Sequence, residues 1–476
     1  MESHKIDRDA LQRFDSRTSG TAVNDERTAL ELAEPGQEAV NVVSREDVPP
    51  DGGYGWICAA CVFFINAHTW GINSAWAIFL SHYLENSTFP GTTQFEFALI
   101  GGLSISQSLL CSPAVAWSMR RFGTKITLAI GTVFVFAALF AASFADQIWQ
   151  LFLSQGVCFG IGMGFLYIPA TAVLPQWFSK KRSLAVGIAS SGAGLGGVAY
   201  NLIAGVAARK LGLNWTYRLL ALCSLAVNAV CAALIRDRNK MVKPKQDYLD
   251  WREFGHIEVV LVIIWGFLSE LGYIVLLYSL PHYATTIGLT QSQGSVVGAV
   301  LNVGLGVCRP LIGYLSDRWG RINVAMFVTL SCGIFCLTLW VPAQSYGLLL
   351  VFALFAGLGA GNFWGTVAAV TAEVVGLQRL PTAFGVICIS LVAPTTFAEP
   401  IGLELVAASG YRSAQIFVGF MFILAASSVW FLRSWKMAEI EGKAGAEEEG
   451  SRDDSGRYHA GLRWLAPRKL FTICRV

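Results

Sequence analysis

The sequence predicts an all-α polytopic membrane protein with twelve transmembrane helices, and three observations support that prediction. The composition is 54% hydrophobic and only 14% charged, with a mean hydropathy of +0.52, whereas soluble domains are about one quarter charged. Nearly two thirds of the charged residues lie in three polar segments, 1–53, 236–253 and 434–476. The apolar remainder contains an internal repeat. A surface that faces lipid needs few charges, so we expect the long apolar stretches to cross a bilayer.

Apolar segments long enough to span a membrane follow one another along the chain. A transmembrane helix needs about 20 mostly apolar residues, and short loops separate the segments that meet this rule. Six segments precede a polar stretch in the middle of the chain and six follow it. The predicted spans are 54–83, 96–118, 126–145, 149–172, 183–208, 217–235, 256–282, 293–315, 322–341, 346–372, 381–407 and 412–432.

These spans divide the chain into five parts. The first part is polar and acidic, which predicts a disordered tail rather than a cleavable signal peptide. The parts are a cytoplasmic N-terminal tail (1–53), a six-helix bundle (54–235), a cytoplasmic linker (236–255), a second six-helix bundle (256–433) and a cytoplasmic C-terminal tail (434–476).

Lys and Arg in the short loops predict the orientation, because cytoplasmic loops carry an excess of these residues. The loop after the fifth span, with Arg209, Lys210 and Arg218, is an exception, and we follow the majority. Both termini and the linker are then cytoplasmic, and we expect a plasma-membrane location. The basic residues that decide this lie after even-numbered spans: Arg120, Arg121, Lys125, Lys180, Lys181, Arg182, Arg318, Arg321 and Arg379.

The internal repeat relates the two groups of six spans. CSPAVAWSMRRFG (111–123) aligns with CRPLIGYLSDRWG (308–320), which shares its Cys, Pro, Arg and Gly positions. The same offset aligns a second set of residues: Gly160 with Gly357, Gly162 with Gly359, Gly164 with Gly361 and Tyr167 with Trp364. Two matches at one offset indicate a duplicated six-helix unit. Because six is even, both copies have the same orientation in the membrane.

Other classes of protein lack support in the sequence. The net charge of +3 is too small to indicate nucleic-acid binding. The sequence contains no G-x-x-x-x-G-K-[ST] loop for ATP and no G-x-S-x-G hydrolase elbow, so we expect neither an ATP-driven pump nor an enzyme. The cysteines lack the spacing of a metal site, and we expect no metal and no cofactor.

A charged loop follows the predicted eighth span. RPLIGYLSDRWGR (309–321) contains G-x-L-x-D-R-x-G-R, which resembles the loop signature of the major facilitator superfamily. Its glycines permit close helix approach, and its Asp and Arg side chains can form charge-assisted bonds across the cytoplasmic face. We interpret the motif as part of a gate. The motif residues are Gly313, Asp317, Arg318, Gly320 and Arg321, and Arg121 is the counterpart of Arg318 in the first half.

Two further motifs resemble the signatures of the monocarboxylate porter family, and of its fungal branch in particular. PDGGYGW (50–56) opens the first span and supplies Asp51, Gly52, Gly53 and Trp56. WFSKKRSLAVGIASSGAGLGG (177–197) opens the fifth span and supplies Lys181 and Arg182. The resemblance implies a major facilitator fold and secondary transport of a small organic anion across the lipid bilayer.

Few ionisable groups lie inside the predicted spans, and such groups are functional candidates by default. Arg309 precedes Pro310 in the eighth span, where the family has an arginine that serves the anionic substrate. A guanidinium stays charged and holds a carboxylate by two parallel bonds. Snorkelling towards the cytoplasm or pairing with Asp317 is the alternative role. The other candidates for substrate contact are Asn73, Asn302, Tyr278 and Trp364.

The residues that would couple transport to protons differ from those of the family's animal members. The family's animal members have an aspartate and a lysine for which this chain has Leu305 and Ser74. Glu270 in the seventh span can supply a protonatable carboxyl instead, and His68 and Glu399 are further candidates for proton coupling. Helix packing through hydrogen bonds is the alternative role for each of the three.

The resemblance therefore implies a secondary active transporter of a monocarboxylate or related organic acid that works by alternating access and is coupled to protons. The alternatives are an efflux pump for a fungal secondary metabolite, or a porter of a larger neutral solute. A sensor that signals without transport is a third possibility.

Overall fold

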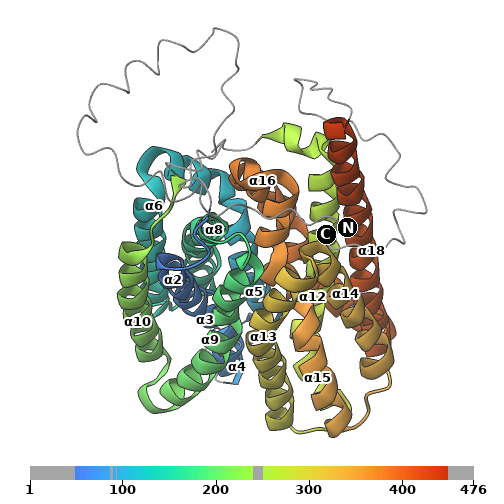
Figure 1. Ribbon diagram of the computed structural model, residues 1–476. Coiled ribbons are helices and arrows are strands. Elements are labelled where there is room, and N and C mark those ends of the chain that lie inside the picture. The colour runs from blue at the N-terminus through green and yellow to red at the C-terminus, as the bar shows by residue number, and fades with distance from the viewer. Residues whose placement is uncertain (1–48, 86–88, 90, 93, 240–249, 449–476) are drawn as a thin grey trace, which may run out of the picture. The chain divides into compact units, whose positions relative to one another are not determined.

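The computed structural model describes residues 49–85, 89, 91–92, 94–239 and 250–448 (Figure 1). Most of the predicted N-terminal tail, the predicted C-terminal tail beyond Glu448 and the middle of the predicted linker therefore lie outside the described residues. The described part consists of helices, and no strand occurs in it. It belongs to one compact unit that begins at Pro49.

The helices of the first half begin at the start of the described chain. Apolar segments with few charges form them, as expected for helices that face lipid. They are α2 (Tyr54–His68), α3 (Trp70–Ser74), α4 (Trp76–Glu85), α5 (Gln94–Leu110), α6 (Ser112–Ala142), α7 (Ile148–Leu151), the π-helix η2 (Phe152–Cys158), α8 (Phe159–Trp177), α9 (Arg182–Leu211) and α10 (Leu213–Leu234).

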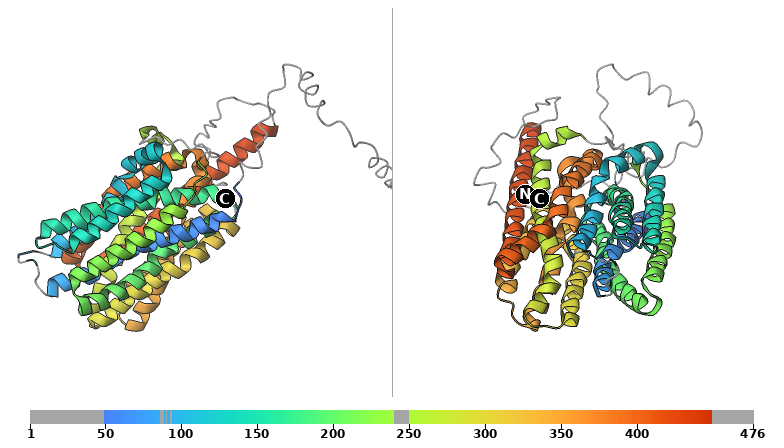
Figure 2. Two further views of the ribbon diagram at one scale, coloured as in Figure 1. Left: turned by 90° about the vertical axis from the view of Figure 1, so that its left-hand side faces the viewer. Right: turned by 180° about the vertical axis from the view of Figure 1, so that it is seen from behind.

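The helices of the second half follow the linker. They are the 3-10 helix η3 (Trp251–Gly255), α12 (Ile257–Thr286), α13 (Gln291–Trp319), α14 (Arg321–Phe335), the π-helix η4 (Cys336–Trp340), α15 (Tyr346–Ala360), α16 (Asn362–Ser390), α17 (Val392–Ser409) and α18 (Tyr411–Glu448). The long helices of both halves run side by side (Figure 2). We call the end of the bundle that carries η3 and residues 235–239 the linker side.

The predicted spans have helical counterparts. Ten segments of the described chain are long and apolar enough to cross a membrane, and a shorter apolar helix covers Leu99–Leu110. One of the ten, Tyr346–Ser409, has 64 residues, about three times the length that one crossing needs. It turns at Gly376, where φ is 79°, so it contains two of the predicted spans. Gly123, with φ of 81°, marks a similar turn within α6, between the second and third predicted spans.

Three details differ from the prediction. The first span is not one continuous helix, because its backbone is interrupted near Thr69 and Ala75. The fourth and ninth spans contain the π-helical turns η2 and η4. The last helix continues to Glu448, well past the predicted end of the bundle, because the sequence there is rich in the strong helix formers Ala, Glu and Lys.

The packing confirms the internal repeat. Gly162 of α8 packs against Val135 of α6, and Gly359 of α15 packs against Cys332 of α14. The two pairs are related by the offset that aligns the halves in the sequence. A Cβ placed on Gly162 or on Gly359 would lie 2.7 Å from its neighbour. The same small-residue contact therefore occurs once in each six-helix bundle, as transmembrane helices that approach closely require.

Three large hydrophobic clusters fill the bundle, and a fourth, small one contains Cys308, Ile312 and Val324. One is built almost wholly from residues of the first half and one from residues of the second half. A third combines both halves and includes Phe165, Tyr167, Trp265 and Phe363. The two halves thus have separate cores and meet along a common apolar contact.

Alanine at Gly162 or Gly359 is expected to destabilise the protein, because the added methyl group must displace a packed neighbour. Overpacking of this kind costs about 1–3 kcal/mol, so the melting temperature in detergent should fall by a few degrees for each variant. Gly205→Ala is the control, because nothing lies within 4 Å of a Cβ at that position of α9. Equal melting of all three variants would contradict the packing argument.

Candidate functional site

Helices α9 and α13 bring the two halves into contact along much of their length. Glycines on both helices allow their backbones to touch. Gly187 packs against the backbone of Arg309, Gly194 against Gly306, and Gly313 against the start of α9. Two polar groups of residues lie along this contact, one at the linker side and one near the middle of the helices.

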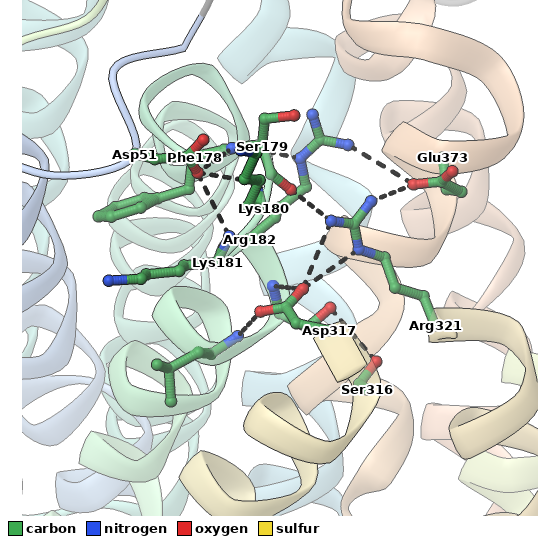
Figure 3. Close-up of polar contacts among 12 residues, drawn as sticks. Asp51, Phe178, Ser179, Lys180, Lys181, Arg182, Ser316, Asp317, Arg321 and Glu373 are labelled. Atoms are coloured by element: carbon green, nitrogen blue, oxygen red, sulfur yellow. Dashed lines mark hydrogen bonds and ion pairs between the residues drawn. The ribbon is translucent and has the colours of Figure 1, made fainter. Parts of the chain in front are cut away.

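The linker-side cluster consists of Asp51, Arg182, Asp317, Arg321 and Glu373 (Figure 3). Asp317 of α13 accepts hydrogen bonds from the backbone N–H groups of Ser183 (2.9 Å) and Leu184 (2.8 Å) in the first turn of α9. A carboxylate at a helix N-terminus is stabilised by the unpaired N–H groups and by the helix dipole. Asp317 therefore ties the second half to the first.

Arg321 extends the cluster across the same contact. Its guanidinium donates to the carboxylate of Glu373 on α16, and its Nη2 donates to the carbonyl of Ser179 at 2.5 Å. Asp317 Oδ1 lies 3.4 Å from the same Nη2. Arg182, 8% exposed, donates through Nε to the carbonyl of Phe178 and approaches Glu373 to 4.0 Å. Both arginines thus converge on one carboxylate.

Asp51 joins the segment that precedes α2 to the turn that precedes α9. Its Oδ1 accepts from the backbone N–H groups of Ser179 (2.7 Å), Lys180 (2.7 Å) and Lys181 (3.3 Å). Its own N–H donates to the carbonyl of Trp177 at 3.1 Å. The two motifs recognised at the starts of the first and fifth spans therefore bind one another.

The remaining residues of the first motif support this contact. Gly52 and Gly53 form the turn before α2, and their carbonyls accept from the N–H groups of Gly55 and Trp56. The Trp56 ring packs edge-on against Phe178, with ring centroids 4.9 Å apart. The motif is therefore a structural unit that holds the start of α2 against the turn before α9.

Some of the predicted gate residues lie outside the cluster. Arg318 is exposed, and its Nη1 contacts the hydroxyl of Tyr314 on the same helix. The side chains of Arg121 and Lys181 are also exposed. Gly320 has a backbone role, because it separates α13 from α14 with φ of 101°.

The central cluster consists of Trp70, Tyr167, Glu270, Arg309 and Trp364. Arg309 is 7% exposed, and its Nη1 donates to the carbonyl of Ser190 on α9 at 2.7 Å. The guanidinium passes beside Gly361, the residue between α15 and α16, where a Cβ would lie 2.7 Å from Nη2. A charged side chain of the second half thus reaches the first half in the interior of the bundle.

Three aromatic rings of this cluster contact one another. The Trp70 ring lies 5.6 Å from Tyr167 and 6.1 Å from Trp364, and the latter two lie 5.8 Å apart. Trp70 Nε1, the Tyr167 hydroxyl and Arg309 Nε are buried without a hydrogen-bond partner among the described residues. Buried donors are rarely left unpaired, so the cluster presents donors that suit an acceptor ligand.

Glu270 of α12 provides the carboxylate of the central cluster. It is 2% exposed, and the indole of Trp364 and the guanidinium of Arg309 are its polar neighbours. No ion pair within 4.0 Å joins Glu270 to Arg309 in the described chain. The carboxyl therefore lies beside the charge of Arg309 without a direct salt bridge.

The other predicted contact residues lie apart from the central cluster. Asn73 accepts from the hydroxyl of Ser104 at 2.8 Å inside the first half, and Asn302 donates to the carbonyl of Gly298 on its own helix. His68 bonds the carbonyl of Phe64 through Nδ1, and its ring packs edge-on against Tyr200. None of these hydrogen bonds reaches a residue of the central cluster.

A second region contains Tyr278 and Glu399. Glu399 lines a cavity of about 190 Å³ between α5 and α17, whose other walls include Leu99, Leu103, Phe152 and Leu403. Tyr278 lies close enough for its hydroxyl to interact electrostatically with Glu399. The two residues are neighbours of one another and do not belong to the central cluster.

Several residues of the two clusters were not selected from the sequence. Glu373 lies beyond the motif that contains its partner Arg321, and Trp70 lies in an apolar stretch without a charge. The sequence contained one indication of Tyr167, because this residue is the counterpart of Trp364 in the internal repeat. The carbonyls of Ser179 and Ser190 belong to the backbone, which carries no signal of this kind in the sequence.

Two six-helix bundles that enclose buried polar groups define a polytopic membrane transporter. A model of the Major Facilitator Superfamily matches residues 56–290 and again residues 262–472. The chain therefore belongs to the major facilitator superfamily, and it is a membrane transporter of that type.

Relatives and solved structures agree with this family. The chain is 37% identical over 405 residues to "Probable transporter MCH2" of Saccharomyces cerevisiae, a match that covers 82% of this chain and 85% of the relative. It is 25% identical to "Agnestins efflux protein AgnL12" of Paecilomyces divaricatus, over 78% of this chain and 85% of the relative.

The fold resembles that of the proton:xylose symporter XylE, with a TM-score of 0.65 and 16% identity over 79% of this chain and 95% of that chain. The human organic anion transporter MFSD10 is similar in fold, with a TM-score of 0.62 and 13% identity over 79% of this chain and all (100%) of that chain.

Alanine at Asp51 is expected to lower the stability of the first half. It removes the acceptor of three backbone N–H groups, and alanine disfavours the φ of 53° found there. Losses of helix-capping carboxylates cost about 0.5–2 kcal/mol. Asp51→Asn retains an acceptor and tolerates this backbone conformation, so it should lose less. Asp146→Ala, in an exposed loop, is the control, and thermal unfolding in detergent is the measurement. An Asp51→Ala protein that melts like the control would contradict the assigned contact.

Proposed function

We propose that this protein is a secondary active transporter of a monocarboxylate or related small organic acid, that it works by alternating access, and that it is coupled to protons. The observation that supports the substrate class is the buried guanidinium of Arg309 beside buried donors without acceptors. A carboxylate offers acceptor oxygens and the opposite charge, and a guanidinium can hold it by two parallel bonds.

Alternating access is supported by the way the two halves are joined. At the linker side the bonds of Asp317, and those of Arg321 to the carbonyl of Ser179, cross from one half to the other. In the described conformation these bonds close the linker side. They are few, so the halves can part there when the bonds break. We infer that the linker-side cluster is the gate, and that it faces the cytoplasm.

Coupling to protons is supported by the charge balance of the central cluster. Arg309 and Glu270 together carry no net charge when both are ionised. A bound carboxylate would add one negative charge to this buried region, which is costly in a membrane interior. A proton on Glu270 restores the balance. Glu270 can thus replace the aspartate of related porters, for which this chain has Leu305.

A second candidate function is export of a fungal secondary metabolite. The rings of Trp70, Tyr167 and Trp364 form a contacting group that can stack on a larger planar ligand. The relative from Paecilomyces divaricatus is named as an efflux protein for agnestins. Both functions use the same central cluster, and they differ in the substrate and in the direction of transport.

Arg309→Gln is expected to reduce transport of an anionic substrate strongly. A hydrogen bond to a charged group contributes about 1.5–3 kcal/mol, so binding should weaken roughly tenfold to a hundredfold. The measurement is uptake of labelled short-chain organic acids into liposomes with an imposed pH gradient. Arg318→Gln removes an exposed arginine from the same helix and should leave uptake intact. Accumulation of an acid by Arg309→Gln at the wild-type rate would contradict the substrate site. If the wild type takes up none of the acids, the monocarboxylate assignment is wrong.

Glu270→Gln is expected to separate transport from the proton gradient. The amide cannot gain or lose a proton, so the variant should still exchange labelled for unlabelled substrate but should no longer accumulate it against its gradient. Exchange and pH-driven accumulation are measured on the same liposomes. Glu404→Gln, an exposed position on α17, is the control. A Glu270→Gln protein that accumulates substrate like the wild type would rule out this coupling site.

A further inference from the structure

The described ends of the linker are each fastened to a different half of the protein. At its start, the N–H of Arg238 donates to Gln176 Oε1 at 2.8 Å, and Arg238 Nη1 donates to the carbonyl of Gln176 at 3.1 Å. Trp177 Nε1 donates to the carbonyl of Arg236 at 2.8 Å. The first residues of the linker are therefore bound to the end of α8.

The last residues of the linker are bound to α16. Arg379 Nη2 donates to Glu253 Oε2 at 2.6 Å, and Arg379 Nε donates to Glu253 Oε1 at 3.3 Å. Arg379 Nη1 also lies 3.8 Å from Glu258 Oε1 at the start of α12. Glu253 and Glu258 are 5% and 7% exposed. A two-point pair of this kind between partly buried groups fixes relative position more firmly than a single exposed salt bridge does.

Both attachment points adjoin residues of the linker-side cluster. Gln176 and Trp177 lead directly into Phe178 and Ser179, whose carbonyls accept from Arg182 and Arg321. On the other half, Arg379 follows Glu373 across the turn at Gly376. Gly376, with φ of 79°, has no side chain to restrict its backbone rotation. The position of Glu373, before this turn, therefore depends on the contacts that hold the residues after it.

We propose that Arg379 is a positioning residue for the gate. By binding Glu253 of the linker, it holds the turn at Gly376 so that Glu373 stays within reach of Arg321 and Arg182. Helix η3 is then part of the gate, because any change that pulls Glu253 away from Arg379 favours opening of the linker side. The inference rests on the proposed alternating access, but it depends on neither the substrate nor the coupling ion.

The test uses the reactivity of a cysteine placed inside the closed gate. Ser316 is fully buried (0% exposed), and its hydroxyl contacts that of Ser183 across the two halves. In the full-length protein, the Ser316→Cys reporter should react with a charged maleimide only when the halves part. The alkylation rate, read from the peptide by mass spectrometry, then reports the open fraction without any substrate. Adding Arg379→Gln should raise this rate about threefold to tenfold. Arg252→Gln removes an exposed arginine from the same 3-10 helix as Glu253 and should leave it unchanged.

Two further variants separate positioning from general damage. If Arg379 acts through Glu373, then Arg379→Gln should add almost nothing to the rate once Glu373→Gln is present, as a double-mutant cycle measures. Arg379→Lys, which keeps the charge but not the two-point contact, should retain part of the wild-type protection.

Cys332, also 0% exposed, lies in the core of the second half and reports unfolding. Three outcomes would each overturn the proposal: an unchanged alkylation rate of the Ser316→Cys reporter in Arg379→Gln, effects of Arg379→Gln and Glu373→Gln that add independently, or an equal rise at Cys332. Loss of transport in the liposome experiments with a normal response of the Ser316→Cys reporter would instead count against the proposed substrate alone.

Discussion

The close contact between α9 and α13 is the constraint on which both polar clusters depend. Glycines on the two helices bring backbone against backbone, with Gly194 opposite Gly306 and Gly187 opposite the backbone of Arg309. At this separation the side chains of α13 reach backbone groups of α9. Asp317 thereby reaches the first N–H groups of α9, and Arg309 reaches the carbonyl of Ser190. A larger side chain at these glycines would move both groups out of range.

Helix α13 also connects the two clusters mechanically. Arg309 and Asp317 lie about two turns apart on it, so a displacement of this part of α13 moves both residues. A ligand that draws Arg309 away from Ser190 therefore also acts on the bonds of Asp317. This gives the proposed transport cycle a physical link between the central cluster and the linker side. The link uses a single rigid element that has bonding partners in the opposite half.

The bundle contains few charged residues, and their positions reflect the free-energy cost of burying a charge in lipid. At the linker side, arginines and carboxylates pair with one another or with helix termini, where water is close. In the interior, Arg309 and Glu270 are neighbours without a direct salt bridge, and three donors of the central cluster lack acceptors among the described residues. A charged or polar group that lacks part of its hydrogen-bond partners in the membrane interior raises the free energy of the protein. We interpret that cost as a physical basis for the proposed binding of an anion together with a proton.

The sequence by itself determined the fold class, the approximate spans and the duplication, because these follow from hydropathy, from helix length and from repeated residues at one offset. It also identified Arg309, Asp317 and Arg321, because charges in or beside apolar spans stand out. It did not separate Arg318 from Arg321, since both are arginines of one motif and only the rotation of the helix decides which one faces the other half.

Only the tertiary structure decided which residues meet. Glu373 joins Arg321 from a distant helix, Asp51 binds backbone N–H groups that have no sequence signal, and Asn73 turns towards Ser104 in the interior of its own half. The attachment of the linker to Arg379 is of the same kind. The physical reason is common to all of these contacts, because a bond between two helices depends on their separation and rotation, and packing of the whole bundle sets both.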